Sequence, residues 1–578
     1  SDPWQLLQTY AEAACEQFPP QFPETAPVSW CSWYPYRLSV SEDRLLANAR
    51  IAVERLKPLG LSIMQTDLGW ETQNLPSAFD ENERFPHGLS WLAQQLDSLG
   101  LKLGVWKAPF TISEFDPVCA EHPEWLICDA NGAPLPYWTW FWEPHGKVFI
   151  LDLTQPEVRD FLRQRIASLK MRGVRYLKAD FIGCVTHPLA KNRRDKTIVA
   201  GGGLEAARLG ASLIREALPD ALLLNCGGPE MPGSGHWSLL YTCNDTGNTG
   251  FIGYPFQQTN FQAVACHLFK NYRWGILQPS CLCVGLPGSL EEARLRATVA
   301  FLAGGQVDIS DDLTTLPEDR WEILTATLPP LGISARPIDL FDPICADNSL
   351  DYTGTCQGKT DTGQKPVELP AGSVWQVHVQ SEWDEWDLIG LFSFSKGTSA
   401  PKPEITRFSI PLARLSLSQE ETYTAFEFWS GQYLDAVPGS RKNLSGYTHP
   451  GDYQELKVGG EPNSLQVAFF GPGIKLLCVR KARPHPWVVG TSFHQSCGTE
   501  LQQVTWDAAS GTLSGELHRP RGESGVIVIA PADYELIDVM VQQHKAQVRP
   551  GANGSLTIPI TCANSATPWR ARFQQVLK

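Results

Sequence analysis

Short apolar runs of strand length alternate with longer amphipathic segments over residues 27–335. The predicted strands are Val28–Trp33, Leu61–Thr66, Leu101–Trp106, Val174–Phe181, Ala221–Cys226, Ser238–Cys243, Leu277–Val284 and Gln306–Ser310. Between them, segments such as Leu204–Leu218 and Leu290–Leu302 place apolar residues on one helical face. Eight strands separated by helices predict an α/β protein with a parallel (β/α)₈ TIM barrel, whose functional residues lie at the carboxyl ends of the strands. A doubly wound sheet is disfavoured, because no Gly-x-Gly-x-x-Gly follows the first strand.

Two of the barrel helices carry recognisable start and stop signals. Thr154 followed by Glu157 predicts a capping box, and Gly173 predicts the end of the same helix. Ser39 followed by Glu42 predicts a second capping box. A long Trp-rich segment, residues 110–148, separates the third strand from the first of these helices, so we expect an insertion at the carboxyl end of that strand.

Helical periodicity fades after residue 335, where short alternating runs with Gly, Pro and Asn turns predict antiparallel β structure. We therefore expect four parts: residues 1–26 as a lead-in, 27–335 as the barrel, 336–482 as an antiparallel β domain and 483–578 as a C-terminal β-sandwich. The segment Lys481–Pro486 is the predicted linker between the last two.

Charge and cysteine content exclude several classes of partner. The formal charge of −14, without a Lys/Arg block, argues against nucleic acid and anionic membranes. Fifteen cysteines are scattered without a Cys-x-x-Cys pair, which predicts free thiols in a reducing compartment and no metal site. No apolar segment has membrane-spanning length, so we expect a cytoplasmic protein. We also expect no cofactor, and the oligomeric state stays open.

Lys178 and Asp180 close the fourth predicted strand. Two residues apart on a strand, they point to the same face. Burying either charge without a partner is costly, so they either pair with each other or meet a ligand.

The other predicted strand ends carry carboxylates, amides and indoles, without a phosphate cradle or a Gly-x-Ser-x-Gly elbow. This set suits glycoside chemistry, in which two carboxyl groups flank the bond and an aromatic ring holds the sugar. Asp308, Asp311 and Asp312 precede a helix and are expected to cap it or to be solvated.

Seven motifs occur in the order found in glycoside hydrolase family 36. They are Trp30–Trp33, Thr66–Trp70, Gly104–Trp106, Val148–Val158, Tyr176–Asp180, Cys226–Gly228 and Cys243–Thr246. Over roughly residues 27–330 the chain resembles the α-galactosidases of that family and the related raffinose-synthase-like proteins.

The resemblance implies a role for each matching residue. Asp180 would be the nucleophile and Asp245 the general acid/base, two strands apart and able to reach the roughly 5 Å separation of a retaining mechanism. Asp180 is expected to stay ionised beside Lys178. The expected substrate-binding residues are Trp33, Asp67, Trp70, Trp106, Lys178, Cys226 and Gly227.

One departure from the family leaves the sugar open. Leu68 stands where the family has a second Asp that takes sugar hydroxyls, and Lys107 stands where a Glu is common. Galactose and a modified, 6-deoxy or differently configured sugar all remain candidates. The expected function is a retaining glycosidase acting on an oligosaccharide or glycoside. The alternatives are a transglycosylase of the raffinose-synthase type, favoured if the Trp-rich insertion builds an acceptor platform, and a non-catalytic carbohydrate-binding barrel.

Overall fold

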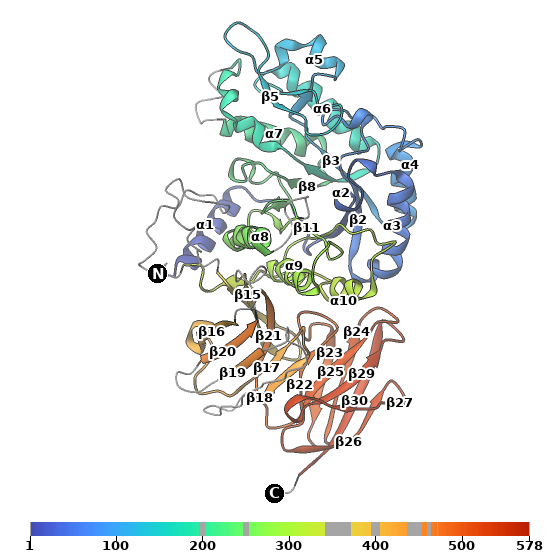
Figure 1. The fold of residues 1–578 in the computed structure, drawn as a ribbon, viewed down its shortest axis with the longest axis vertical. Helices are drawn as coiled ribbons and strands as arrows, with labels where there is room; N and C mark the ends of the chain where they lie inside the picture. The colour runs from blue at the N-terminus through green and yellow to red at the C-terminus, as the bar shows by residue number, and fades with distance from the viewer. Residues whose placement is uncertain are drawn as a thin grey trace. The chain divides into compact units, whose positions relative to one another are not determined.

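The computed structural model describes residues 2–195, 203–246, 254–341, 372–394, 405–435, 454–458, 464–470 and 472–576. The chain divides into two compact units. The first contains residues 1–250, 267–286 and 304–317, and the second contains residues 251–266, 287–303 and 318–578. Figure 1 labels the helices and strands of both units.

The first unit is built on a parallel sheet that closes on itself. Its strands are β1 (Val28–Cys31), β2 (Leu61–Thr66), β3 (Lys102–Lys107), β7 (Val174–Ala179), β8 (Leu222–Asn225), β9 (Leu239–Tyr241), β10 (Ile276–Gln278), β11 (Cys281–Leu282) and β12 (Val307–Ile309). They pair in the order β10-β9-β8-β7-β3-β2-β1-β12-β11. The two ends of this order, β10 and β11, are consecutive in the chain, so the sheet forms a nearly closed barrel. The predicted fold class is confirmed.

The barrel has eight positions, which we call staves, and the seventh is divided. The sequence predicts one weak strand over Leu277–Val284, but the structure has β10 and β11 with Pro279 and Ser280 between them. Ser280 adopts a φ of +60°, which takes it out of the strand conformation. The fourth stave is β7 and the sixth is β9, as the prediction required.

Helices α1 (Pro3–Gln17), α3 (Glu42–Arg55), α4 (Gly88–Ser98), α6 (Pro156–Met171) and α7 (Leu204–Ala217) also belong to the first unit. Two predicted caps are wrong. Helix α3 is capped by Ser41, whose hydroxyl accepts from the Arg44 N–H at 3.3 Å, rather than by Ser39. Helix α6 begins after Gln155, because Thr154 donates its hydroxyl to Asp152 at 2.6 Å instead of capping.

The Trp-rich segment after β3 is an insertion, as predicted. It contains β4 (Thr111–Ser113), α5 (Pro117–Glu121), β5 (Pro136–Thr139) and β6 (Lys147–Ile150). The strands form a separate antiparallel sheet in the order β4-β6-β5. The insertion therefore starts at the carboxyl end of the third stave, the end at which we expect the functional residues.

In its described residues, the second unit contains three α-helices and the antiparallel β regions. Helices α8 (Tyr254–His267), α9 (Leu290–Ala303) and α10 (Glu318–Ala326) follow staves six, seven and eight along the chain and, except for His267, fall in this unit. No described helix combines the length and the apolar character needed to cross a bilayer.

The first antiparallel region has a six-stranded sheet, β13-β14-β15-β21-β17-β18, and a three-stranded sheet, β16-β20-β19. Its strands are β13 (Arg336–Pro337), β14 (Val374–Gln380), β15 (Glu385–Ser393), β16 (Ile405–Pro411), β17 (Tyr423–Glu427), β18 (Gln432–Asp435), β19 (Gln454–Val458), β20 (Ser464–Phe470) and β21 (Gly473–Lys481). Leu391, Leu465 and Leu477 lie in one apolar core shared by the two sheets.

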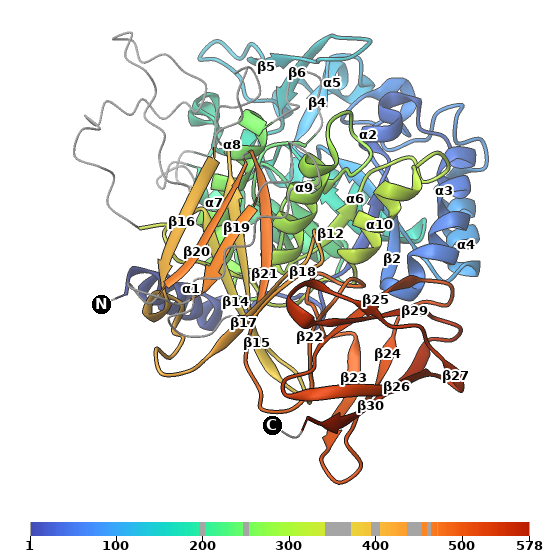
Figure 2. The same ribbon diagram turned by 60° about the horizontal axis from the view of Figure 1, so that its bottom comes forward.

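The second antiparallel region has the sheets β22-β25-β29-β28 and β23-β24-β30-β26-β27 (Figure 2). Its strands are β22 (Trp487–Thr491), β23 (Leu501–Asp507), β24 (Thr512–His518), β25 (Ser524–Ala530), β26 (Tyr534–Val541), β27 (His544–Lys545), β28 (Arg549–Pro550), β29 (Leu556–Thr561) and β30 (Ala566–Gln575). Leu513, Ile527 and Trp569 share its core. Two antiparallel β regions after the barrel are as predicted, while the domain boundaries at 335 and 482 stay predictions.

Candidate active site

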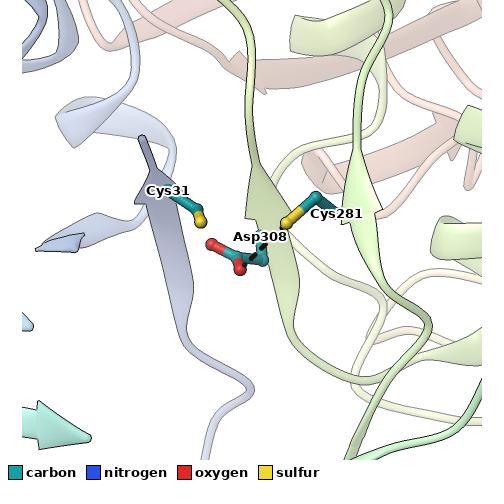
Figure 3. A group of neighbouring side chains, drawn as sticks. All are labelled: Cys31, Cys281 and Asp308. Atoms are coloured by element: carbon teal, nitrogen blue, oxygen red, sulfur yellow. Dashed lines mark hydrogen bonds between the residues drawn. The ribbon is translucent and has the colours of Figure 1, made fainter. Parts of the chain in front are cut away.

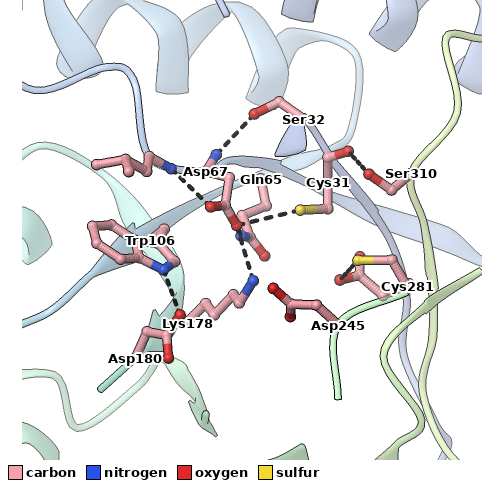
Figure 4. Close-up of polar contacts among 12 residues, drawn as sticks. Cys31, Ser32, Gln65, Asp67, Trp106, Lys178, Asp180, Asp245, Cys281 and Ser310 are labelled. Atoms are coloured by element: carbon pink, nitrogen blue, oxygen red, sulfur yellow. Dashed lines mark hydrogen bonds and ion pairs between the residues drawn. The ribbon is translucent and has the colours of Figure 1, made fainter. Parts of the chain in front are cut away.

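Asp180 follows β7 directly and enters the mouth of the barrel with two donors on its carboxylate (Figure 4). Trp106 on β3 donates its indole N–H to Oδ2 at 3.0 Å, and the Phe181 backbone N–H donates to Oδ1 at 2.6 Å. Phe181 has a φ of +54°, a left-handed conformation that ends the stave. Asp180 is therefore held in one orientation by groups from two neighbouring staves.

The pKa of Asp180 is shifted upward. Burial raises it, the Lys178 ammonium opposes this shift, and the Asp245 carboxylate adds to it. The direction is opposite to the one expected from Lys178 alone. In the view of Figure 4, the Lys178 side chain lies between those of Asp180 and Asp245.

Lys178 does not pair with Asp180. Its ammonium lies 3.1 Å from Oδ2 of Asp67, and the two side chains are 5% and 3% exposed. Burial alone would lower the pKa of Lys178, but the Asp67 carboxylate and its neighbours raise it well above the ordinary value. A buried Lys178–Asp180 ion pair is thus ruled out, and Lys178 stays charged beside both Asp67 and Asp180.

Asp67 is already fully engaged by protein donors. Its Oδ2 accepts from Lys178, from Gln65 Nε2 at 2.8 Å and from Cys31 Sγ at 3.4 Å, while Oδ1 accepts from the Leu68 N–H at 2.9 Å. A carboxylate offers about four lone-pair positions. The predicted contact between Asp67 and a sugar hydroxyl therefore requires it to give up one of these partners, and its evident role is to anchor Lys178.

Asp245 lies four residues beyond β9 and is held by a chain of hydroxyls that the sequence did not reveal. Tyr241, the last residue of β9, donates its hydroxyl to Oδ1 of Asp245 at 2.7 Å. The same hydroxyl lies 2.6 Å from Ser280 Oγ, which accepts from the Thr246 N–H at 3.0 Å. Tyr241 has one hydrogen to give, so Ser280 must donate to it. The break in the seventh stave thus supports the carboxylate carried by the sixth.

The candidate tryptophans occupy different positions. Trp106 reaches Asp180, and Trp33, in the short helix α2 (Trp33–Tyr36), packs edge-on against Trp142 of the insertion with ring centroids 5.2 Å apart. Trp70 has no exposed surface, and its indole N–H points to the Trp106 carbonyl at 3.4 Å. The role of Trp70 in substrate binding stays a prediction.

Cys226 and Gly227 follow β8 and line the side of Asp180. The Cys226 pKa is raised well above its ordinary value by burial and then by the Asp180 carboxylate, so the residue is a neutral thiol. Gly227 has a φ of +69°, and a Cβ placed on it would lie 3.7 Å from Asp180 Oδ1. Both residues thus face the candidate nucleophile.

Lys107 is a buried partner of Glu71. Its ammonium lies 3.1 Å from Oε1 of Glu71, both side chains are 0% exposed, and Glu71 Oε2 accepts from the Gly69 N–H at 2.9 Å. The lysine that departs from the family pattern thus fixes the loop after β2.

Asp308 and Asp311 were expected at a helix cap or in solvent, and both expectations are wrong. Asp308 lies on β12 with its side chain buried, where it accepts from Ser29 Oγ at 2.6 Å and from Gln278 Nε2 at 2.8 Å. Burial raises its pKa to about 6. Asp311 accepts from the backbone N–H groups of residues 284 and 285 at 2.9 and 2.7 Å. Only strands distant in sequence bring these donors to the two aspartates.

Cys31, Cys281 and Asp308 bring three potential metal-ligand atoms within 4.8 Å of one another (Figure 3). A metal would need both sulfurs as thiolates. Instead, Cys281 donates to Asp308 and Cys31 donates to Asp67, both at 3.4 Å. Burial raises the pKa of each thiol. The group therefore fits two protonated, hydrogen-bonded thiols better than a metal centre.

A TIM barrel with carboxylates at the ends of staves four and six, beside a buried lysine and an indole donor, has the architecture of the glycoside hydrolase barrels. Within that class, residues 20–200 match the melibiase family model. The family resemblance predicted from the motifs is thereby confirmed for this part of the chain.

Individual relatives agree with the family match. The chain is 28% identical over 161 residues to α-galactosidase Mel36A of Lactobacillus acidophilus and 25% identical over 162 residues to α-galactosidase AgaA of Geobacillus stearothermophilus. Each alignment covers 27% of this chain and 20% of the length of the relative.

Among solved structures, a β-L-arabinopyranosidase of Geobacillus stearothermophilus in complex with arabinose is similar with a TM-score of 0.52. The match covers 80% of this chain and 98% of that one at 15% identity. At this identity the likeness shows the fold alone.

Proposed function

We propose that this protein is a retaining glycoside hydrolase that cleaves α-galactosides or closely related α-glycosides by double displacement. The observation that carries the proposal is the setting of two carboxylates at the barrel mouth: Asp180 is held by two donors at the end of the fourth stave, and Asp245 is held by the Tyr241 hydroxyl after the sixth. The α-galactosidases that are similar to part of this chain support the substrate class.

In this proposal Asp180 is the nucleophile and Asp245 is the acid/base. Asp180 attacks the anomeric carbon while Asp245 gives its proton to the leaving oxygen, so the glycosidic bond breaks as the glycosyl-enzyme bond forms. Asp245 then takes a proton from water, and the resulting hydroxide equivalent releases the sugar from Asp180 with net retention.

Neighbouring groups supply charge and shape. The Trp106 N–H orients the nucleophile, and the Lys178 ammonium, anchored by Asp67, is placed to bind a sugar hydroxyl. The Tyr241 hydroxyl fixes the rotamer of Asp245. The proposal uses only side chains of this chain and needs no cofactor.

Two experiments test the proposal together. A panel of nitrophenyl α- and β-glycosides should identify one α-glycoside that is cleaved, and a mechanism-based fluoroglycoside of that sugar should label Asp180, as found by peptide mass spectrometry. Asp180→Asn should abolish both turnover and labelling. Asp160→Asn, a substitution on the exposed face of α6, is the matched control and should change neither. A label on another residue, or turnover by Asp180→Asn, would overturn the assignment.

A transglycosylase is the second candidate, because the aromatic insertion lies beside the site. Trp142 contacts Trp33, and such rings can hold an acceptor sugar in place of water. Chromatography of the products with and without added free sugar distinguishes the two. A product longer than the donor indicates transfer, and free monosaccharide alone indicates hydrolysis.

A further inference from the structure

The insertion places a run of aromatic residues next to the candidate nucleophile. Trp138, at the end of β5, and the following Trp140, Phe141 and Trp142 form one cluster of rings. The ring centroids are 6.0 Å apart for Trp138 and Phe141, 5.0 Å for Trp140 and Trp142, and 5.6 Å for Phe141 and Trp142. We call these four residues the aromatic cluster.

Phe181 connects the aromatic cluster to the acids. Its ring centroid lies 4.6 Å from that of Trp138 and 6.2 Å from that of Trp140. On its other side Phe181 lies 6.3 Å from Trp106, the donor to Asp180. The aromatic surface thus begins one residue from the nucleophile and extends away from it.

The outer part of the aromatic cluster is open to solvent. Phe141 is 62% exposed, and Trp138 and Trp142 are half-buried. A purely structural aromatic core would be covered by other side chains, and this one is not.

We infer that the aromatic cluster is a second sugar-binding subsite, which takes the pyranose ring on the other side of the scissile bond. This inference rests on the proposed function, since the first sugar must lie between Asp180 and Asp245. The apolar face of a pyranose suits stacking on the exposed ring of Phe141 and the half-buried ring of Trp138. The ligand is therefore an α-galactosyl oligosaccharide, whose second ring is the leaving group in hydrolysis or the acceptor in transfer.

Phe141→Ala tests the subsite, because this side chain is exposed and its loss leaves the packed rings in place. Phe115→Ala is the matched control, since Phe115 is an exposed phenylalanine, 48% accessible, of the same insertion outside the aromatic cluster. The probes are methyl α-D-galactopyranoside, with one ring, and an α-(1→6)-linked galactosyl-glucose disaccharide, with two. Phe141→Ala should lower kcat/KM for the disaccharide about 5- to 10-fold, the loss of one stacking contact, and change the methyl glycoside by less than about twofold.

The same variants give a second readout that does not need turnover. Calorimetric titration of Asp180→Asn with the disaccharide should give a tighter Kd than with the methyl glycoside, and adding Phe141→Ala should remove most of that difference. Equal effects of Phe141→Ala on both probes, or an equal loss in Phe115→Ala, would overturn the subsite while leaving the proposed function intact. Failure of the unsubstituted protein to cleave or bind either probe would overturn the assignment of galactose, on which this form of the subsite depends.

Discussion

Asp67→Asn removes the negative charge that holds the Lys178 ammonium in the barrel. The two groups are 3.1 Å apart, and their side chains are 3% and 5% exposed, so solvent cannot replace the lost partner. Removing one member of a buried ion pair costs about 3–5 kcal/mol of unfolding free energy. Asp180 remains as a second negative neighbour of Lys178, so we expect the lower end, about 3 kcal/mol.

A double-mutant cycle isolates this interaction. Lys178→Met should cost a similar amount, because it leaves the Asp67 carboxylate buried without its cation. The double variant should cost about 3 kcal/mol or less, rather than about 6, because both charges are gone. The chain has more than one unit, so a single unfolding free energy is not defined. Hydrogen exchange read by mass spectrometry on peptides from β2 and β7 reports the opening free energy of the barrel itself.

The control is an exposed ion pair of the same unit. Arg163 and Asp160 are paired on α6 with 42% and 69% exposure, so Asp160→Asn should change the exchange free energies by less than about 0.5 kcal/mol. Strictly additive losses in the Asp67→Asn and Lys178→Met cycle would refute the reasoning, because they would mean that the two charges do not stabilise each other.

Three further predictions concern the carboxylates. Trp106→Phe removes the hydrogen-bond donor to Asp180, a charged hydrogen bond worth about 1.5–3 kcal/mol, so kcat/KM should fall about 10- to 100-fold. Because this donor lowers the pKa of Asp180, its loss should move the acid limb of the kcat/KM profile to higher pH, and an unmoved limb would contradict the role. Tyr241→Phe removes the hydroxyl that orients Asp245, so kcat should fall about tenfold for a methyl glycoside, whose leaving group needs a proton. The loss should be smaller for a nitrophenyl glycoside, and equal losses would contradict a role of Tyr241 in protonation. Asp308 has a pKa raised to about 6, so its contribution to stability is present below pH 4 and is lost as the pH rises through 6. Relative to the unsubstituted protein, the opening free energy of the neutral Asp308→Asn variant should therefore rise by about 2.4 kcal/mol between pH 4 and pH 7. Hydrogen exchange at both pH values measures this change, and a constant difference would disprove the shift.

The barrel was predictable from the sequence because its evidence is local. The predicted strand Ala221–Cys226 begins with four consecutive apolar residues, whereas the intervening helices have one apolar face, so the spacing of apolar residues separates the two. The first residues of the helices were harder to predict than the helices themselves. Ser39 and Thr154 both have the right chemistry for caps, but Ser41 is the cap of α3, and Asp152 takes the Thr154 hydroxyl.

The candidate site was predictable only in part, because its pairings join distant strands. The strand-end positions of Asp180 and Asp245 follow from the pattern. The partner of Lys178 does not, because Asp67 lies 111 residues away. Asp308 was missed for the same reason, since its donor Ser29 lies 279 residues earlier in the chain. Tyr241 reads as an ordinary strand residue until the fold brings Ser280 to it.

The divided seventh stave has a consequence for circular permutation. No ladder of backbone hydrogen bonds joins β10 to β11, so new termini at residues 279–280 would open the chain without breaking a strand pair. The same cut would release Ser280 from Tyr241 and from the Thr246 N–H. A circularly permuted protein with these new termini should keep its barrel, while Asp245 loses its fixed orientation. The break between β10 and β11 thus separates the requirements of folding from those of proton transfer.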